Sequence, residues 1–222
     1  MPRYREKARE RYLTGKELAR LSDALNRAET VGLPPATKHR KHAKSDRTRK
    51  HRPKSADTPR IANLYAVAAI RLLSLTGLCE REALTLRWDA IDSERGMVTL
   101  EESKTGKSIR PLGAPALALL AELPRVAGNP YAFPGRDARS HLSDLTRVWY
   151  AVLEAAQLDG IRLHDLRHTV ASVAASGGSS LLLVGRLLGH KDTKSTQRYA
   201  HLVEHAQRET ADRTARAISA ML

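Results

Sequence analysis

A strongly basic stretch near the N-terminus limits how this chain of 222 residues can fold. Residues 37–60, TKHRKHAKSDRTRKHRPKSADTPR, hold ten Lys or Arg against two Asp and have almost no apolar side chains. A segment of this composition cannot bury enough apolar surface to order itself, so we expect a flexible linker. It divides the chain into an N-terminal stub with a lead-in helix at 1–36, the linker at 37–60, and a globular domain at 61–222.

A helix is predicted within the first of these parts. Thr14 and Glu17 stand at the spacing of a capping box, in which each side chain accepts a hydrogen bond from the other residue's backbone N–H. Gly32 and the prolines after it are typical of a helix end. Between these limits, leucines at helical spacing form one apolar stripe: Leu18, Leu21 and Leu25.

Beyond residue 60, apolar helical patterns alternate with Gly and Pro. Helices are expected at 62–75, 80–88, 115–122, 140–157, 164–176, 179–188 and 195–220. The segments MVTLEES and SIRPL flank KTGK, which predicts a β-hairpin with Gly106 in its turn. The predicted fold class is therefore mainly α with a small antiparallel β-sheet (α+β).

The charge balance indicates the kind of partner. The chain has 38 Lys or Arg against 24 Asp or Glu, a net charge of +14, and eight of these net charges lie in the linker. Such an excess favours a polyanion, and 4% aromatic residues argue against a single-strand binder that stacks bases. We therefore expect double-stranded DNA as the partner. A solvated spacer is the other interpretation of the linker. In the DNA interpretation its basic residues follow the phosphates: Lys38, Arg40, Lys41, Lys44, Arg47, Arg49, Lys50, Arg52 and Lys54.

The sequence contains no apolar run long enough to span a bilayer, and its first residues have no apolar core that could serve as a signal peptide. A single cysteine, Cys79, cannot form an internal disulfide. We therefore expect a cytoplasmic protein with no membrane partner.

Two motifs carry residue types suited to phosphodiester chemistry. In HDLRHT, residues 164–169, His164 and Arg167 are three positions apart and share a helix face. A guanidinium can bind two non-bridging phosphate oxygens, and an imidazole can move a proton. In LLGHKDTKSTQRYAHL, residues 187–202, His190 follows a helix-ending glycine and Tyr199 comes later in the segment. Lys104 lies at the hairpin tip; taken singly, Tyr199 would be a packing aromatic and Lys104 a solvated surface lysine.

Together with TGL, LRW and SKTGKS, these motifs resemble the tyrosine recombinase (phage integrase) family over roughly residues 60–205. The motifs occur in the family's order and at about its spacing. The resemblance implies site-specific DNA recombination or integration, by strand breakage and rejoining through a 3′-phosphotyrosyl intermediate, with no cofactor. It also implies a mobile element of bacterial or phage origin and a nucleoid-associated location.

The resemblance also implies a role for each site residue. Tyr199 would be the nucleophile and Arg167 would clamp the scissile phosphate. His164 would assist proton transfer, His190 would hydrogen-bond the phosphate, and Lys104 would protonate the departing 5′ oxygen. The chemistry is consistent with these roles, because a covalent intermediate conserves the energy of the bond and cationic donors stabilise the charged transition state.

One position departs from the family pattern. The family has the first of two clamping arginines directly after Thr-Gly-x, and this chain has Cys79 there, with Glu82 fixing the alignment as a supporting acidic residue. Arg81 would point to nearly the opposite helix face. A thiol offers no cationic fork. Losing such a donor costs about 10²–10³ in rate, or ~10³–10⁵ for an arginine finger, so we expect severely impaired activity.

These residue types also allow other roles. Arg167 would lower the pKa of Cys79, so a reactive thiolate is conceivable, but a small, partly buried side chain is favoured. His164 and His168, and likewise His201 and His205, have the four-residue spacing of helical metal ligands. Neither pair has the glutamate of a zincin motif, and His168 and His205 are interpreted as packing or surface residues. No metal site is expected.

Two functions from different classes remain open. The chain is either a strand-transferase with reduced or lost activity, or a non-catalytic duplex-DNA-binding remnant or accessory protein on the same fold. A basic protein for RNA or anionic membranes would explain the charge but not the ordered motifs. Family members also carry an N-terminal core-binding domain, of which at most the tail would fit before Thr14. Residues 204–222 could pack in cis or join a homo-oligomer on DNA.

Overall fold

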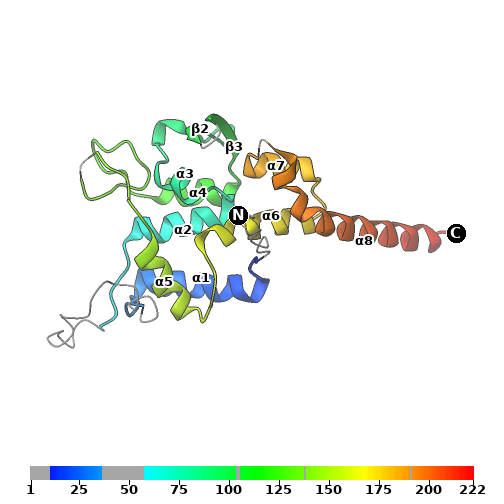
Figure 1. Ribbon diagram of the computed structural model, residues 1–222, viewed down its shortest axis with the longest axis horizontal. Helices are drawn as coiled ribbons and strands as arrows, with labels where there is room; N and C mark the ends of the chain where they lie inside the picture. The colour runs from blue at the N-terminus through cyan, green and yellow to red at the C-terminus, as the bar shows by residue number, and fades with distance from the viewer. Residues whose placement is uncertain (1–10, 37–57, 104–105, 138, 191) are drawn as a thin grey trace, which may run out of the picture.

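The computed structural model describes residues 11–36, 58–103, 106–137, 139–190 and 192–222. Eight α-helices, three short 3-10 helices and one three-stranded sheet follow one another along these residues. The predicted fold class, mainly α with a small antiparallel sheet, is confirmed (Figure 1). The elements are α1 (Gly15–Thr30), α2 (Leu64–Thr76), α3 (Glu80–Leu84), η4 (Trp88–Ala90), β1 (Ile91–Asp92), β2 (Met97–Ser103), β3 (Gly106–Pro111), α4 (Ala114–Glu122), α5 (Thr146–Ala155), α6 (Leu163–Ser176), α7 (Leu181–Leu188), η5 (Thr193–Ser195), η6 (Gln197–Tyr199) and α8 (Ala200–Ser219).

The predicted start of the lead-in helix is confirmed. The Thr14 hydroxyl accepts a hydrogen bond from the Glu17 N–H at 3.3 Å, and the Glu17 carboxylate accepts one from the Thr14 N–H at 2.9 Å. The buried face of α1 packs on α5 and α2 and belongs to the main hydrophobic core. Leu33 pairs with Arg60, so the two ends of the segment between them lie side by side. The division at residues 37–60 stays a prediction.

Helix α2 is the centre of the core. Most of its residues are buried, and it ends at Gly77, whose left-handed φ of 67° suits a helix cap. The short helix predicted at 80–88 is wrong in length, because α3 ends at Leu84. The backbone of residues 86–88 instead pairs with residues 130–132: the Ala132 N–H donates to the Leu86 carbonyl at 2.8 Å.

The sheet has the order β1-β2-β3 and is antiparallel throughout. The predicted hairpin is confirmed, but Gly106 is not in its turn: with a φ of 90° it begins β3 and pairs with Ser103. Strand β1 was not predicted because only two residues pair. Val98 of β2 lies opposite Arg110 of β3, and both side chains are buried.

Helices α6, α7 and α8 form a second apolar cluster at the other end of the molecule. The helix predicted at 140–157 begins only at Thr146, because the loop before it is held by its own contacts, including a 2.8 Å bond from the Leu142 N–H to the Phe133 carbonyl. The helix predicted at 195–220 is two 3-10 turns followed by α8.

The distal part of α8 extends away from the rest of the molecule (Figure 1). Its side chains from residue 207 to the C-terminus are all exposed, so this part makes no core in cis. Within the described ranges, no helix combines the length and the apolar character needed to cross a bilayer.

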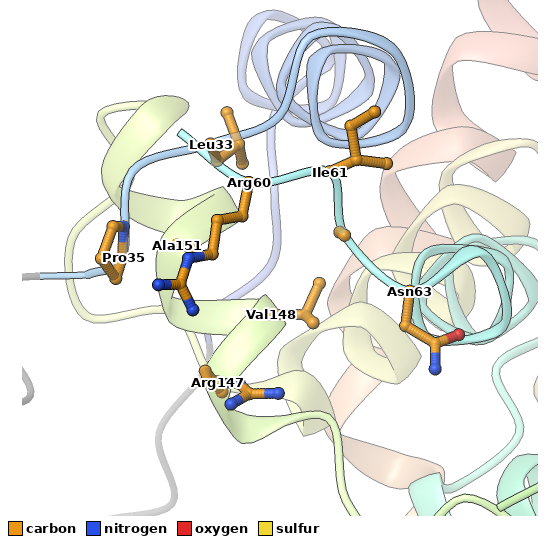
Figure 2. Close-up of a pocket in the computed structure, with 9 residues that line it drawn as sticks. Leu33, Pro35, Arg60, Ile61, Asn63, Arg147, Val148 and Ala151 are labelled. Carbon is orange, nitrogen blue, oxygen red and sulfur yellow. The ribbon is translucent and has the colours of Figure 1, made fainter. Parts of the chain in front are cut away.

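A hollow of about 340 Å³ lies between the end of α1, residues 60–63 and α5 (Figure 2). Two arginines, Arg60 and Arg147, line it together with apolar side chains. None of the predicted catalytic residues lines this hollow. The predicted chemistry lies at the junction of α2, α6, α7 and β3.

Candidate active site

The candidate nucleophile, Tyr199, closes η6 and is packed against α6 and α7. Its ring is only 5% exposed and joins the second apolar cluster with Val184 and Leu188. The Tyr199 ring therefore has the packing role expected of an isolated tyrosine. Burial raises the pKa of the Tyr199 hydroxyl, while Arg198 and Arg167 oppose that rise.

The Tyr199 hydroxyl contacts a histidine that the sequence analysis assigned to packing or the surface. It lies 2.6 Å from Nδ1 of His168 on α6. This contact gives His168 a candidate role besides packing. When the His168 proton is on Nε2, Nδ1 accepts the hydrogen bond from the phenol. His168 is thus placed to receive the phenolic proton.

His164 stands one turn before His168 on the same helix face. Its exposed ring meets the His168 ring edge-on, with centroids 4.8 Å apart. A pocket of about 240 Å³ opens beside Tyr199 and His168, and Arg11 and Arg198 line it. A phosphate entering this pocket would meet two cations from separate segments, Arg11 before α1 and Arg198 in η6.

Arg167 lies near the nucleophile but is anchored by backbone carbonyls. Its Nη1 donates to the Gly77 carbonyl at 2.6 Å and its Nη2 to the Leu188 carbonyl at 2.7 Å. The Thr-Gly turn after α2 and the end of α7 therefore fix the position of this guanidinium. Burial is the main cause that lowers the pKa of Arg167, and Arg110 lowers it further.

Cys79 caps the N-terminus of α3, where its backbone N–H donates to the Glu82 carboxylate at 2.9 Å. The predicted lowering of its pKa by Arg167 is wrong in net direction, because burial raises the pKa of the thiol. A neutral, half-buried thiol is a poor nucleophile. Arg81 is exposed on α3 while Glu82 is buried, as the helix spacing predicted.

A buried arginine that sequence reasoning missed lies beside Glu82. The Arg110 side chain is 3% exposed, and its Nη2 is 3.1 Å from the Glu82 carboxylate. Its guanidinium fills the space next to Gly189, where a Cβ would lie 1.3 Å from Nη1. Arg110 therefore reaches from the hairpin to the turn after α7.

His190 follows that turn. The Gly189 φ of 66° ends α7, and the His190 N–H closes the turn on the Gly185 carbonyl at 2.8 Å. His190 Nδ1 lies 2.9 Å from the Thr196 hydroxyl. The predicted helix-terminal placement of His190 is confirmed, and its role toward a phosphate stays a prediction.

The electrostatics of the site favour an anion. Burial and the neighbouring arginines lower the pKa of both His168 and His190 to about 4, and they lower the pKa of His164. Burial first, and the surrounding positive charge second, therefore hold the imidazoles neutral. An anion that offsets this charge would raise these pKa values.

The remaining predicted residues lie outside the described residues. These are Lys104 and the linker cations Lys38, Arg40, Lys41, Lys44, Arg47, Arg49, Lys50, Arg52 and Lys54. Across the ranges that the structure describes, no group of three or more His, Cys, Asp or Glu is arranged to hold a metal ion. His205 is exposed beside Glu209, as expected of a surface residue.

Comparison with known proteins gives a consistent picture. Residues 53–205 match the sequence profile of the phage integrase family. The tyrosine recombinase XerC of Xanthomonas axonopodis pv. citri is 31% identical over 140 residues, which cover 61% of this chain and 46% of the relative. The tyrosine recombinase XerA of Saccharolobus solfataricus is 32% identical over 138 residues, covering 60% of this chain and 45% of the relative.

Solved structures share the fold. The crystal structure of XerA recombinase has a TM-score of 0.61 at 19% identity, over 96% of this chain and 66% of that one. The catalytic domain of bacteriophage HP1 integrase has a TM-score of 0.56 at 18% identity, over 90% of this chain and 93% of that one. This chain spans less than half the length of the curated relatives named above. From the profile match over most of its length, the chain belongs to the phage integrase family and has the tyrosine recombinase catalytic-domain fold.

Proposed function

We propose that this chain breaks and rejoins DNA strands at specific sites, with Tyr199 as the nucleophile. One observation carries the proposal: the Tyr199 hydroxyl, the His168 imidazole and the Arg167 guanidinium come together from η6 and α6. A general acceptor beside a buried phenol and a cation beside both are what phosphoryl transfer to a tyrosine requires.

The proposed step is balanced as follows. The Tyr199 oxygen forms a bond to phosphorus as the bond from phosphorus to the 5′ oxygen breaks, and the phenolic proton passes to His168. The 5′ oxygen takes its proton from Lys104, the role that the family resemblance implies. The phosphotyrosyl bond keeps the energy of the phosphodiester, so a 5′ hydroxyl can reverse the step without ATP.

Arg167 would hold the non-bridging oxygens throughout this step, because a guanidinium binds two phosphate oxygens in a fork. His164 stands next to His168 and would exchange protons with it, and His190 would hydrogen-bond the phosphate. His190 follows the turn after α7 that also fixes Arg167. These roles stay predictions.

Double-stranded DNA is the proposed substrate. The net charge of +14 supports a polyanionic partner. Structural neighbours that share the fold include XerH site-specific recombinase bound to difH substrate and the Tn1549 transposon integrase in complex with circular intermediate DNA. The exposed distal part of α8 supports the further proposal that copies of the chain join through this helix on DNA.

Cys79 favours a second candidate function. If no other guanidinium serves the phosphate, a loss of about 10²–10³ in rate follows, and the chain would occupy DNA without cutting it. Binding and cleavage are therefore measured separately in the experiment below.

The experiment uses nicked duplexes with randomised sequence around the nick, so that the departing fragment diffuses away and the covalent product accumulates. We expect a protein–DNA complex that survives SDS with the native chain and is absent with Tyr199→Phe, which keeps the ring packing. Equal DNA binding by both proteins would show that only the chemistry is lost. DNA binding without any covalent product would support the second candidate.

A further inference from the structure

Strand β3 places its side chains opposite to what their polarity suggests. Ile109 is 57% exposed, whereas its neighbour Arg110 is 3% exposed and lies opposite the fully buried Val98. A strand that exposes isoleucine and buries arginine loses hydrophobic burial and desolvates a cation. Burying the guanidinium in place of the isoleucine costs free energy, so we expect the guanidinium to have a function that requires its buried position.

The partners found in the structure do not satisfy this guanidinium. Glu82 pairs with Nη2, while Nε and Nη1 are buried and have no hydrogen-bond partner among the described residues. The other oxygen of Glu82 is occupied by the Cys79 N–H. Two buried donors of one arginine therefore remain available to an acceptor that comes from outside the chain.

The two guanidiniums border the same turn. Arg167 donates to the Leu188 carbonyl, and Arg110 lies against the next residue, Gly189. The anchors of Arg167 are neutral carbonyls, so the carboxylate of Glu82 is what opposes the two positive charges. The pair keeps an excess of positive charge in a largely buried place, which an anionic oxygen pair would neutralise.

We propose that Arg110 supplies the second guanidinium for the scissile phosphate, from β3, in the place that Cys79 leaves without a cation. This inference rests on the proposed strand-transfer function. Nη1–H and the second N–H of Nη2 form the end fork of the guanidinium, which can bind two oxygens of one phosphodiester, while the first N–H of Nη2 stays on Glu82. The impairment expected from Cys79 alone is then not expected of this chain.

The central variants are Arg110→Met, which keeps the length of the side chain without its charge, and Arg87→Met as the matched control at an exposed arginine. On nicked duplexes we expect Arg110→Met to form covalent product about 10²–10³ times more slowly than the native chain, and Arg87→Met to match the native rate. Equal rates for the two variants would overturn the proposal.

A relocated arginine separates a phosphate contact from a purely structural role. The double variant Cys79→Arg/Arg110→Met should recover most of the lost rate, because the new guanidinium enters the space that Arg110 leaves. Cys79→Arg in the otherwise native chain should give no gain, because the place is filled. A large gain from that single variant, or no recovery in a folded double variant, would contradict the proposal.

Two further measurements cover failure to fold and failure of the activity itself. Arg110→Lys keeps the charge beside Glu82 but not the fork, so we expect a folded protein with a reduced rate; full activity would overturn the proposal.

Inorganic phosphate should raise the thermal midpoint of the native chain and of Arg87→Met but not of folded Arg110→Lys. If native protein forms no covalent product yet shows this pattern, the anion site stands and the proposed activity fails. Equal stabilisation of all three proteins overturns the role of Arg110.

Discussion

At the scale of single residues, the site depends on keeping charges available without neutralising them internally. The Tyr199 phenol is buried and bonded to a neutral imidazole, and Arg167 is held by carbonyl oxygens rather than by a carboxylate. These contacts fix the position of Arg167 without neutralising its charge, which Glu82 opposes only in part because it is paired with Arg110. A phosphate can therefore supply the compensation when it binds.

The first residue-scale prediction concerns the partner of the nucleophile. His168→Phe keeps a ring but removes the acceptor from the Tyr199 hydroxyl, so covalent product formation should slow by about 10²–10⁴. The measurement is the rate on nicked duplexes, and His201→Phe in the same pocket is the matched control. An unchanged rate for His168→Phe would remove this residue from the mechanism.

The second residue-scale prediction concerns acid stability. The pKa of His168 and of His190 is about 4 in the folded chain against a usual value of 6.5, so the unfolded chain binds more protons between these values. The stabilisation that this pKa difference gives is therefore fully present above pH 6.5, the usual pKa of histidine, and is lost as the pH falls toward about 4. The slope cannot exceed ~2.7 kcal/mol per pH unit for two protons, and partial solvent exposure of both rings reduces it.

Urea unfolding from about pH 7 to about pH 5 measures this slope. His168→Gln and His190→Gln should each flatten it. Glu17, with its pKa lowered to about 2 chiefly by Arg11, titrates in a lower pH window and does not interfere. A slope that none of these variants changes would contradict the lowered imidazole pKa values.

At the scale of elements, α6 carries most of the candidate catalytic side chains, and two turns hold one of them in position. His164, Arg167 and His168 lie on one face of α6, while Gly77 and the residues after α7 hold the arginine from both sides. The hairpin brings Arg110 to the same place. The site is thus a meeting point of short turns on a helical core.

The element-scale prediction tests that meeting point through glycine. Gly128 and Gly189 both have left-handed φ, 78° and 66°, but a Cβ at Gly128 meets open space while one at Gly189 strikes the Arg110 guanidinium. Gly128→Ala should therefore cost only the backbone term, about 1–2 kcal/mol. Gly189→Ala should cost a further 1–3 kcal/mol, roughly, by urea unfolding. If Gly189→Ala and Gly128→Ala lowered the free energy of unfolding by the same amount, the Arg110 guanidinium would not lie against Gly189.

Much of this arrangement follows from local sequence. The Thr14 capping box, the hairpin around Gly106 and the turn before His190 are local signals, and the structure contains each of them. The early end of α3 could not be predicted, because it results from pairing with residues distant in sequence. Arg110 was missed because polarity alone assigns the arginine of an Ile-Arg pair to the solvent.

For His168, the sequence predicts the helix face on which the side chain lies but not the contact that the side chain makes. It stands four residues after His164 and so shares its helix face, but sequence spacing cannot say which ring meets Tyr199. That contact depends on how η6 packs against α6. Tertiary packing, rather than the motif, decides between the two histidines.

At the scale of the whole molecule, the distal part of α8 extends from the core that holds the small cationic site. The linker carries much of the net charge and α8 extends from the core with exposed side chains. The α8 residues from 207 onward add nothing to the described core. We expect both the linker and this part of α8 to act only on DNA or on another copy of the chain.

The linker prediction concerns salt. Replacing its nine cations between residues 38 and 54 by serine should weaken DNA binding and reduce the slope of log affinity against log salt by at most ~8, since each phosphate contact contributes about 0.9. Fluorescence anisotropy over a salt series measures the slope. An unchanged slope would make the linker a solvated spacer.

The prediction for α8 concerns assembly. Ending the chain after residue 207 removes only exposed side chains, so the thermal midpoint should change little. Light scattering of DNA complexes should then show smaller assemblies. Ile218→Glu, which leaves the helix in place, is the matched variant at an exposed apolar position and should act in the same direction. A large loss of stability on truncation would instead indicate packing in cis.

The covalent attachment site tests the central claim most directly. The SDS-stable complex is digested with nuclease and protease, and the peptides are analysed by mass spectrometry. The account predicts a nucleotide joined through its 3′ phosphate to the peptide that contains Tyr199, with a free 5′ hydroxyl on the released strand. A nucleotide on any other residue, or cleavage that leaves no covalent adduct, would contradict it.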